Sequence, residues 1–304
     1  FANDGNNVAG IDFNGMDGRN TFINTGNYVS GVTFNGGSDA DRFINSGESL
    51  ASAVFNAGAG DDWLILSGSY SQDITMNGGE GDDVWFILSA ATDNYGPFTF
   101  SSGDGDDIFV DRGRYTNNVT FDGGNGNDFL QLEGQWSYYF TFDGGEGNDV
   151  LLHASGYASN IEFNAGAGND VFESRSDSGG YFTMYGGDGE DAYYQNVGSA
   201  DGIEFYGEDG DDTLLNFANE VGQIAFDGGA GNDILQNTGN DIYSIQFTSG
   251  GGRNTLQNFG NRIGSLTLIN EDTSPNSSDT LLNSGSTIGQ IFVESTLPLT
   301  LISS

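Results

Sequence analysis

A turn pattern of seven residues returns along this chain at a nearly constant interval. In its clearest form, from Asp122 to Asp128, it reads Asp-Gly-Gly-Asn-Gly-Asn-Asp. Ten of the twelve intervals between closing residues are 21 residues long, and the other two are 24 and 25. A repeat of this length buries its apolar face only by stacking on its neighbours, so we predict a solenoid. The closing residues are Asn20, Asp41, Asp62, Asp83, Asp107, Asp128, Asp149, Asp170, Asp191, Asp212, Asp233, Asn254 and Asp279.

Apolar residues recur at fixed places, counted here from the closing residue as position 0. Position +2 is large and apolar in every repeat, from Phe22 to Leu281. Positions +12 and +14 are apolar around a mostly polar +13, which is the period-2 alternation of a β-strand. We therefore expect one strand just after the closing residue and a second strand that ends just before the glycine turn. The predicted fold class is all-β, a right-handed parallel β-solenoid of about 13–14 coils.

The repeat predicts a single domain over residues 1–304. Residues 1–13 are expected to be a partial first coil, and residues 291–304 a terminal strand with a partial cap that includes Leu297–Leu301. Insertions at Ser89–Pro97 and Asn270–Ser278 are expected to lengthen two loops without changing the register. Because the first coil starts halfway round, we expect the chain to be a segment of a larger protein.

A second turn follows the short strand and carries Asn-x-Gly in several repeats, for example Asn24 to Gly26 and Asn237 to Gly239. Stacked Asn side chains at +4 are predicted to form an amide ladder that satisfies buried turn backbone. The ladder is expected to break in the middle, at Leu66, Ile87, Asp111, Leu132 and His153.

Charge and composition narrow the range of partners. The net charge is −37, there is no Lys, and all seven basic residues are Arg. Nucleic acid is therefore an unexpected partner, because phosphate binding needs basic patches. No apolar run is long enough to span a bilayer, so no membrane insertion is expected. There is no Cys, so a secreted chain of this kind needs another staple, for which metal is the obvious choice.

Stacked turns create an electrostatic problem that a cation solves. Identical turns in successive coils place the closing carboxylates about 4.8 Å apart. A like-charged pair at that distance costs about 1 kcal/mol in water and several in a less polar setting. Carboxylates and exposed turn carbonyls are hard oxygen donors, which favour calcium over zinc or copper. The alternative interpretation is a tight turn with a solubilising tip, because Asp and Gly are common in turns.

These turns resemble the Gly-Gly-x-Gly-x-Asp-x-apolar-x repeat of the repeats-in-toxin (RTX) family, whose members build calcium-binding parallel β-rolls. The resemblance implies that closing Asp side chains and turn carbonyls of adjacent coils share calcium ions. The carboxylates implied as ligands are Asp62, Asp83, Asp107, Asp128, Asp149, Asp170, Asp191, Asp212 and Asp233. The implied turn glycines are Gly60, Gly81, Gly105, Gly126, Gly147, Gly168, Gly189, Gly210 and Gly231.

The chain departs from the family in using one such turn per 21 residues rather than two per coil. We therefore expect one column of Ca²⁺ ions along one edge, with up to eight ions between the first and last of these carboxylates. The turns that close with Asn20 and Asn254 carry Arg19 and Arg253 beside them, and a cation there repels calcium. The turn that closes with Asp41 lacks the fourth-position glycine and is left outside the ligand set.

No catalytic constellation can be assembled from the sequence. The chain has one His, no Cys and no Lys, and its regularly placed carboxylates are accounted for by the turns. His153 stands in the +4 column and is interpreted as a turn or core residue rather than a base. The chain is therefore not expected to be an enzyme.

Three surface columns suggest binding roles. Tyr115, Trp136 and Tyr157 occupy +8 in consecutive repeats and are predicted to form an aromatic strip for sugar rings, or else to cover a neighbouring core. Thr recurs at +13, as in ice-binding solenoids, one of which is a calcium-dependent adhesin segment that this chain loosely resembles. Thr is also simply a good exposed strand residue. An outward apolar column at +3 predicts lateral packing on a partner or on a second copy.

Together these features predict a calcium-stabilised extracellular module with a structural or adhesive role at a cell surface or in a matrix. Self-association and binding to a surface polysaccharide are the expected partnerships. The alternatives are a carbohydrate-binding module of a secreted protein and an ice-binding adhesin segment.

Overall fold

The computed structural model describes residues 1–88, 94–154, 156–176, 178–196, 198–270, 272, 277–295 and 298–303. Its strands form two compact units, Phe1–Gly156 and Tyr157–Ser304, and each unit is a parallel β-solenoid. The coils are about fourteen in number, and the described residues contain no helix. The all-β parallel solenoid predicted from the repeat is therefore confirmed. The single domain from 1 to 304 stays a prediction.

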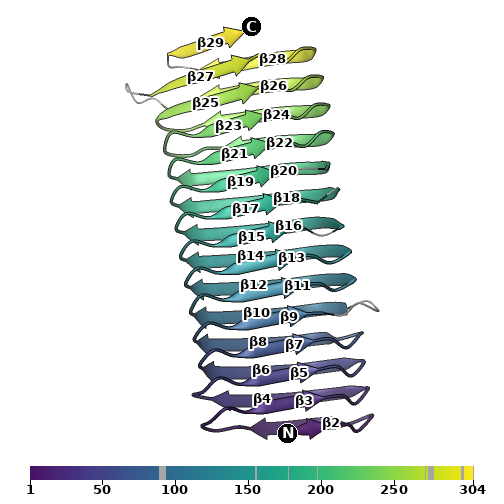
Figure 1. The fold of residues 1–304 in the computed structure, drawn as a ribbon. Helices are drawn as coiled ribbons and strands as arrows, with labels where there is room; N and C mark the ends of the chain where they lie inside the picture. The colour runs from purple at the N-terminus through teal and green to yellow at the C-terminus, as the bar shows by residue number, and fades with distance from the viewer. Residues whose placement is uncertain are drawn as a thin grey trace. The chain divides into compact units, whose positions relative to one another are not determined.

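In the first unit each coil contributes one short and one long strand, and each kind forms its own sheet (Figure 1). The short strands are β1 (Ala2–Asn3), β3 (Thr21–Asn24), β5 (Arg42–Asn45), β7 (Trp63–Leu66), β9 (Val84–Ile87), β11 (Ile108–Asp111), β13 (Phe129–Leu132) and β15 (Val150–His153). The long strands are β2 (Ala9–Asn14), β4 (Val29–Gly37), β6 (Leu50–Ala59), β8 (Gln72–Glu80), β10 (Asn94–Asp104), β12 (Tyr115–Asn125) and β14 (Trp136–Glu146).

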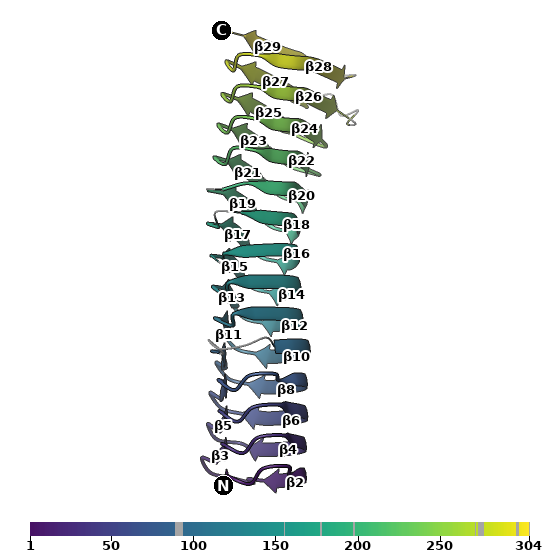
Figure 2. The ribbon, with the colours of Figure 1, turned by 90° about the vertical axis from the view of Figure 1, so that its right-hand side faces the viewer.

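The second unit repeats this arrangement, with short strands on the left and long strands on the right of Figure 2. Its short strands are β17 (Val171–Ser174), β19 (Ala192–Gln195), β21 (Thr213–Asn216), β23 (Ile234–Asn237), β25 (Arg253–Asn258), β27 (Ser278–Asn283) and β29 (Leu299–Ser303). Its long strands are β16 (Tyr157–Ala167), β18 (Gly179–Asp188), β20 (Ala200–Asp209), β22 (Val221–Asp227), β24 (Ile242–Ser249), β26 (Ile263–Asn270) and β28 (Ile288–Ser295).

Strand pairing is parallel and keeps equivalent positions of successive coils side by side, as in Leu130 beside Leu151. The first insertion leaves this register intact, because Phe98 pairs with both Ile74 and Val119. The register also resumes after the second insertion, where Asn254 pairs with Asp279. Residues 89–93, 271, 273–276 and Leu297 of the predicted insertions and tail lie outside the described residues.

One expected boundary is wrong. The long strands of several coils do not end before the glycine turn, since β14 continues through its first two glycines to Glu146. The backbone there is still paired in the ladder, as Gly124 lies beside Gly145. Glycine lacks side-chain packing and usually weakens strands, but here the neighbouring coil supplies a partner of the same conformation, with φ 96° at Gly124 and 103° at Gly145.

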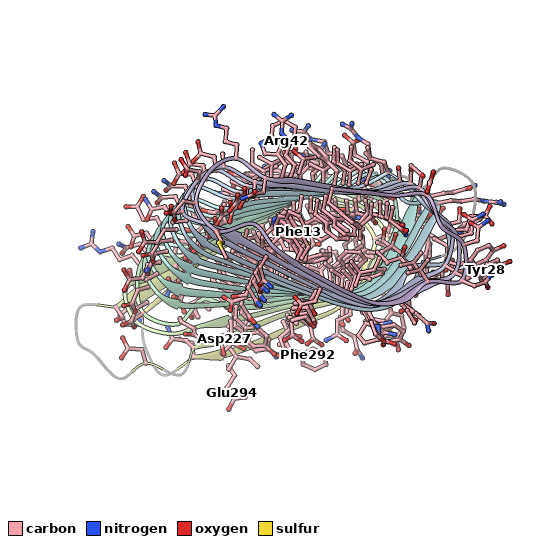
Figure 3. All side chains as sticks on the ribbon, turned by 90° about the horizontal axis from the view of Figure 1, so that it is seen from below. Phe13, Tyr28, Arg42, Asp227, Phe292 and Glu294 are labelled. Carbon is pink, nitrogen blue, oxygen red and sulfur yellow. The ribbon has the colours of Figure 1, made fainter. Side chains whose placement is uncertain are left out.

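The core lies between the two sheets of each unit and is built from the +2, +12 and +14 columns. Phe13 points into this interior, whereas Arg42 and Tyr28 project outward (Figure 3). The inward rings stack at the coil spacing, with centroids 5.1 Å apart for Phe22 and Phe43 and 4.8 Å apart for Phe205 and Phe226. Such pairs add about 0.5–1.5 kcal/mol each beyond area burial. The predicted apolar columns are thus confirmed as core.

The amide ladder predicted at +4 is also confirmed. The Nδ2 of Asn237 donates to Oδ1 of Asn258 at 2.8 Å and to the carbonyl oxygen of Gly239 at 3.0 Å. The same pattern joins Asn24 to Asn45 at 2.7 Å. In the middle coils the position is instead buried and filled by Leu66, Ile87, Asp111, Leu132 and His153.

Candidate metal column at the glycine turns

The closing carboxylates are buried inside the turns. Position 0 has the same parity as +2, so its side chain enters the coil next to the core column. The solvent-exposed fraction of Asp83, Asp128 and Asp212 is 1% or less. All nine carboxylates implied by the family resemblance are buried in this way.

One oxygen of each carboxylate ties two coils together. The backbone N–H of Asp107 donates to Oδ1 of Asp128 at 2.8 Å, and that of Asp191 donates to Oδ1 of Asp212 at 2.9 Å. Asn254 forms the equivalent hydrogen bond, because its Oδ1 accepts the backbone N–H of Asp233 at 2.8 Å. This half of the side chain is therefore structural, and either Asp or Asn can supply it.

The second oxygen, Oδ2, is buried without a donor. Among the described residues, no hydrogen-bond partner reaches Oδ2 of eight closing carboxylates. They are Asp41, Asp62, Asp83, Asp107, Asp128, Asp191, Asp212 and Asp233. A buried carboxylate oxygen without a donor costs several kcal/mol of folding free energy, on the order of 2–7 kcal/mol for a neutral polar group alone.

The backbone of the first glycine of the turn, position −5, lies close against this oxygen. A methyl group on Gly123 would lie 2.1 Å from Oδ2 of Asp128 and 2.7 Å from the carbonyl oxygen of Gly144 in the next coil. Gly207 stands in the same relation to Asp212, at 2.2 Å, and to the carbonyl oxygen of Gly228, at 2.7 Å. The orphan carboxylate oxygen and a carbonyl oxygen of the following coil thus both lie close to the backbone of this glycine.

In three coils that lack the full motif, the second side-chain atom of the closing residue has a hydrogen-bond partner. The Nδ2 of Asn254 donates to the carbonyl oxygen of Gly251 at 3.0 Å, and that of Asn20 donates to the carbonyl oxygen of Gly18 at 2.5 Å. Oδ2 of Asp279, after the second insertion, accepts hydrogen bonds from Ser249 and Asn270. Protein donors or acceptors of the turn therefore pair with this atom in Asn20, Asn254 and Asp279, whereas Oδ2 of Asp128 and of Asp41 has no donor among the described residues.

Burial shifts the protonation of these groups. Desolvation raises the pKa of Asp83 and Asp128 to about 8. It raises the pKa of Asp212 and Asp233 to about 7, and carboxylates of neighbouring coils add to the increase. The common and largest cause is burial, which disfavours the charged carboxylate.

The glycines at −2, which the sequence analysis took as carbonyl donors, all have positive φ. Gly126 has φ 132°, and a methyl group on it would lie 1.8 Å from the carbonyl oxygen of Gly105. Only glycine tolerates both the conformation and the approach. The carbonyls of this column thus point from coil to coil, and the contact of Asn20 with Gly18 places one of them next to the closing side chain.

The donor set fits a hard cation. In the part of the chain that the structure describes, no three His, Cys, Asp or Glu side chains gather to hold a metal by themselves. Any ion in the column would instead take one carboxylate and backbone carbonyls, which are the oxygen ligands that calcium accepts in flexible geometry. His153, buried at +4, is not among the turn residues.

Sequence reasoning missed two parts of this arrangement. One carbonyl near the orphan oxygen comes from position −5 of the following coil, and the available signal was that −5 holds only small residues. In three of these coils position −5 is Ala57, Ser102 or Ala165, so a Cβ stands there instead of a glycine hydrogen. Asp41, which the sequence analysis left out, has a buried orphan Oδ2 like the others.

The predicted aromatic strip is partly covered by its neighbours. Tyr115 and Trp136 lie side by side in β12 and β14 and are half-buried. The guanidinium of Arg114 lies over the Trp136 ring, 5.6 Å from its centroid, and the Tyr115 ring packs against Tyr138 at 5.5 Å. Tyr157 is half-buried at the start of the second unit.

The Thr column lies on the outer face of the long-strand sheet. Four consecutive coils of the first unit carry it in register, where Thr75, Thr99, Thr120 and Thr141 pair in sequence. The Asn ladder on the same face, in which Asn56 donates to Asn35 at 2.8 Å, gives this surface a second ordered polar column.

Comparison with protein-family models, with curated protein sequences and with solved structures returned no match. Among the described residues, no helix is long and apolar enough to cross a membrane.

Proposed function

We propose that this chain is a calcium-stabilised repeat module of the RTX type, with a non-catalytic structural or adhesive role outside the cell. The observation that carries the proposal is the contrast between Asp and Asn at the closing position. Asn254 donates its amide to a turn carbonyl, whereas Asp128 offers an oxygen in the equivalent place and receives no donor. A divalent cation satisfies both the carboxylate and the facing carbonyls.

Calcium would bind between coils, held by Oδ2 of the closing Asp, the −5 carbonyl of the following coil and a −2 carbonyl. The ion supplies the positive charge that these acceptors lack. Because its ligands come from successive coils, each ion also links those coils. This replaces the disulfides that a secreted chain would otherwise use as staples.

The test is thermal unfolding in low salt, with calcium against a chelator. A ligand that binds only the folded state stabilises it by about 2.7 kcal/mol per site at one hundred times its dissociation constant. We expect a large increase in the midpoint with calcium. Equal midpoints in calcium and chelator would refute the proposal. Anomalous scattering then locates the ions, which we expect on the glycine edge and not at Asn20 or Asn254.

A carbohydrate-binding role is the second candidate. Tyr185 and Tyr206 stack with centroids 5.0 Å apart at an angle of 8°, and both rings are exposed beside a hollow lined by Asn164 and Asp188. Stacked, half-exposed aromatic rings suit the apolar faces of sugars. Retention on a polysaccharide that is lost with Tyr206→Ala supports this role, and retention unaffected by Tyr206→Ala and Trp136→Ala counts against it.

A further inference from the structure

Two arginines of the first unit, Arg19 and Arg42, form no ion pair with a described residue, although the chain is strongly acidic. The chain has 44 acidic residues and seven Arg, and three of those Arg form ion pairs. Within the described residues, neither Arg19 nor Arg42 makes a hydrogen bond or an ion pair with an acidic side chain. Both are exposed, and Arg42 projects outward in Figure 3.

The repeat brings these two cations to one place. Arg19 is at −1 of its coil and Arg42 at +1 of the next coil, and both line a hollow of about 340 Å³. The hollow is completed by Trp63 and by polar groups of Asn20, Thr21 and Asp61, with Ala40 between them. A volume of this size accommodates a single small ring compound rather than a polymer segment.

The aromatic wall holds one cation in position. The Arg42 Cζ lies over the Trp63 ring, 5.7 Å from its centroid, and the Phe86 ring packs on Trp63 at 6.3 Å. Stacking on an aromatic face fixes the guanidinium plane and leaves its edge N–H groups free for a ligand. A fixed guanidinium matches the two oxygens of a carboxylate and makes paired, charge-assisted hydrogen bonds with them.

Asp61, the one acidic residue among those described that line the hollow, forms no ion pair with either arginine. Oδ1 of Asp61 accepts the backbone N–H of Asp82 at 3.1 Å, which turns that oxygen toward the next coil. Its other oxygen and the Thr21 hydroxyl can form hydrogen bonds with hydroxyl groups of a ligand. The hollow therefore combines a carboxylate-binding end with hydroxyl-binding walls.

We propose that this hollow binds a sugar acid, with the carboxylate of one hexuronate unit held by Arg19 and Arg42 and its ring hydroxyls held by Thr21 and Asp61. The site goes beyond the calcium proposal and does not depend on it. Its coil closes with Asn20, whose amide already satisfies the turn carbonyl, so binding is expected to persist in chelator.

The experiment is calorimetric titration of the whole chain, in chelator and in calcium, with methyl glucuronoside, methyl glucoside and acetate. We expect the uronoside to bind about tenfold or more tightly than the other two probes. Arg19→Gln and Arg42→Gln are each expected to weaken uronoside binding about tenfold or more, with an unchanged unfolding midpoint.

Arg253→Gln is the matched control, because Arg253 also stands at −1 before a closing Asn but has only Thr255 and Thr280 at the neighbouring +1 positions. It is expected to leave binding unchanged. Absence of uronoside binding overturns the proposal, and so does acetate binding of equal strength or an equal loss with Arg253→Gln. A titration with a uronate oligomer then distinguishes a free sugar acid from a polymer end as the source.

Discussion

At the residue scale, the candidate metal column depends on one atom of each closing side chain. Asp and Asn are equal at Oδ1, which accepts a backbone N–H of the preceding coil in both cases. They differ at the second atom, which is a donor in Asn254 and an acceptor in Asp128. Substituting one for the other therefore separates the structural part of the side chain from its metal-binding part.

At a pH above the pKa of about 8 of Asp128, where the carboxyl is ionised, Asp128→Asn is expected to stabilise the protein in chelator and to reduce its stabilisation by calcium. The new amide replaces a buried acceptor without a partner by a donor to a turn carbonyl, a change on the order of 1–3 kcal/mol. The measurement is the denaturant midpoint of variant and wild type, with and without calcium. A variant that is less stable than wild type in chelator would contradict the assignment of Oδ2.

The reciprocal control is Asn254→Asp, where Arg253 stands beside the turn. Here a donor is removed and a buried acceptor is created, so the chain is expected to lose stability in chelator. Because the adjacent Arg repels cations, calcium is expected to restore less of the loss than it contributes at Asp128.

At the element scale, the alternation of apolar residues was sufficient to place every strand of the repeat. The inward columns and the +4 ladder follow from parity, because identical positions of successive coils must lie side by side. The end of the long strand did not follow, since glycines at its end read as a turn and yet Gly124 and Gly145 are paired. The surroundings of Oδ2 could not be predicted either, because the path of the turn decides which carbonyl of the next coil lies near this oxygen.

The amide ladder is expected to contribute measurably to the second unit. Asn237 accepts from Asn216 at 2.7 Å and from the N–H of Gly239 at 3.2 Å, and it donates onward to Asn258. Asn237→Ala leaves these buried groups without partners and should cost about 1–3 kcal/mol. Gln236→Ala, on the outer face of the same strand, should change the urea midpoint little. Equal losses in the two variants would show that the ladder adds nothing beyond packing.

Stability is expected to depend on pH through His153, which replaces Asn where the amide ladder is interrupted. Burial lowers the pKa of His153 from 6.5 to about 3, because the interior disfavours the charged imidazolium. The unfolded chain therefore binds more protons than the folded chain between these two values, and stability falls as pH falls through that window. Above pH 6.5 the histidine is neutral in both states and has no effect.

His153→Gln is expected to remove this loss, since Gln195 is buried at the same position of another coil. The difference in unfolding free energy between wild type and variant should change by up to about 1.4 kcal/mol per pH unit below 6.5. The check is urea unfolding at several pH values in calcium. Parallel pH profiles of the two proteins would contradict the buried neutral state.

At the scale of the whole molecule, negative charge opposes association, and the proposed calcium ions would reduce that charge. The chain carries a net charge of −37. Eight calcium ions would change the net charge to about −21, which would lower the repulsion between copies. Neutralisation alone does not select a contact surface, so a surface with few charges has to supply the attraction.

The first unit offers such a surface on the outer face of its short-strand sheet. The +1 and +3 columns of three successive strands are apolar there, and we call these residues the outer apolar patch. They are Trp63, Ile65, Val84, Phe86, Ile108 and Val110. Trp63 and Ile108, which flank Val84 on this face, are 39% and 38% exposed and so leave large apolar side chains open to solvent.

Calcium-dependent association is therefore expected to involve the outer apolar patch. Light scattering across a calcium titration should show growth of oligomers, because calcium orders the coils and lowers the repulsion between them. Phe86→Asp should suppress that growth. It should lower the free energy of unfolding in calcium by no more than about 1 kcal/mol, since Phe86 is only half-buried. Gln131→Asp adds the same charge in the same column outside the patch and should still associate. Should the wild type stay a monodisperse monomer at every calcium concentration, self-association is wrong and the module acts alone.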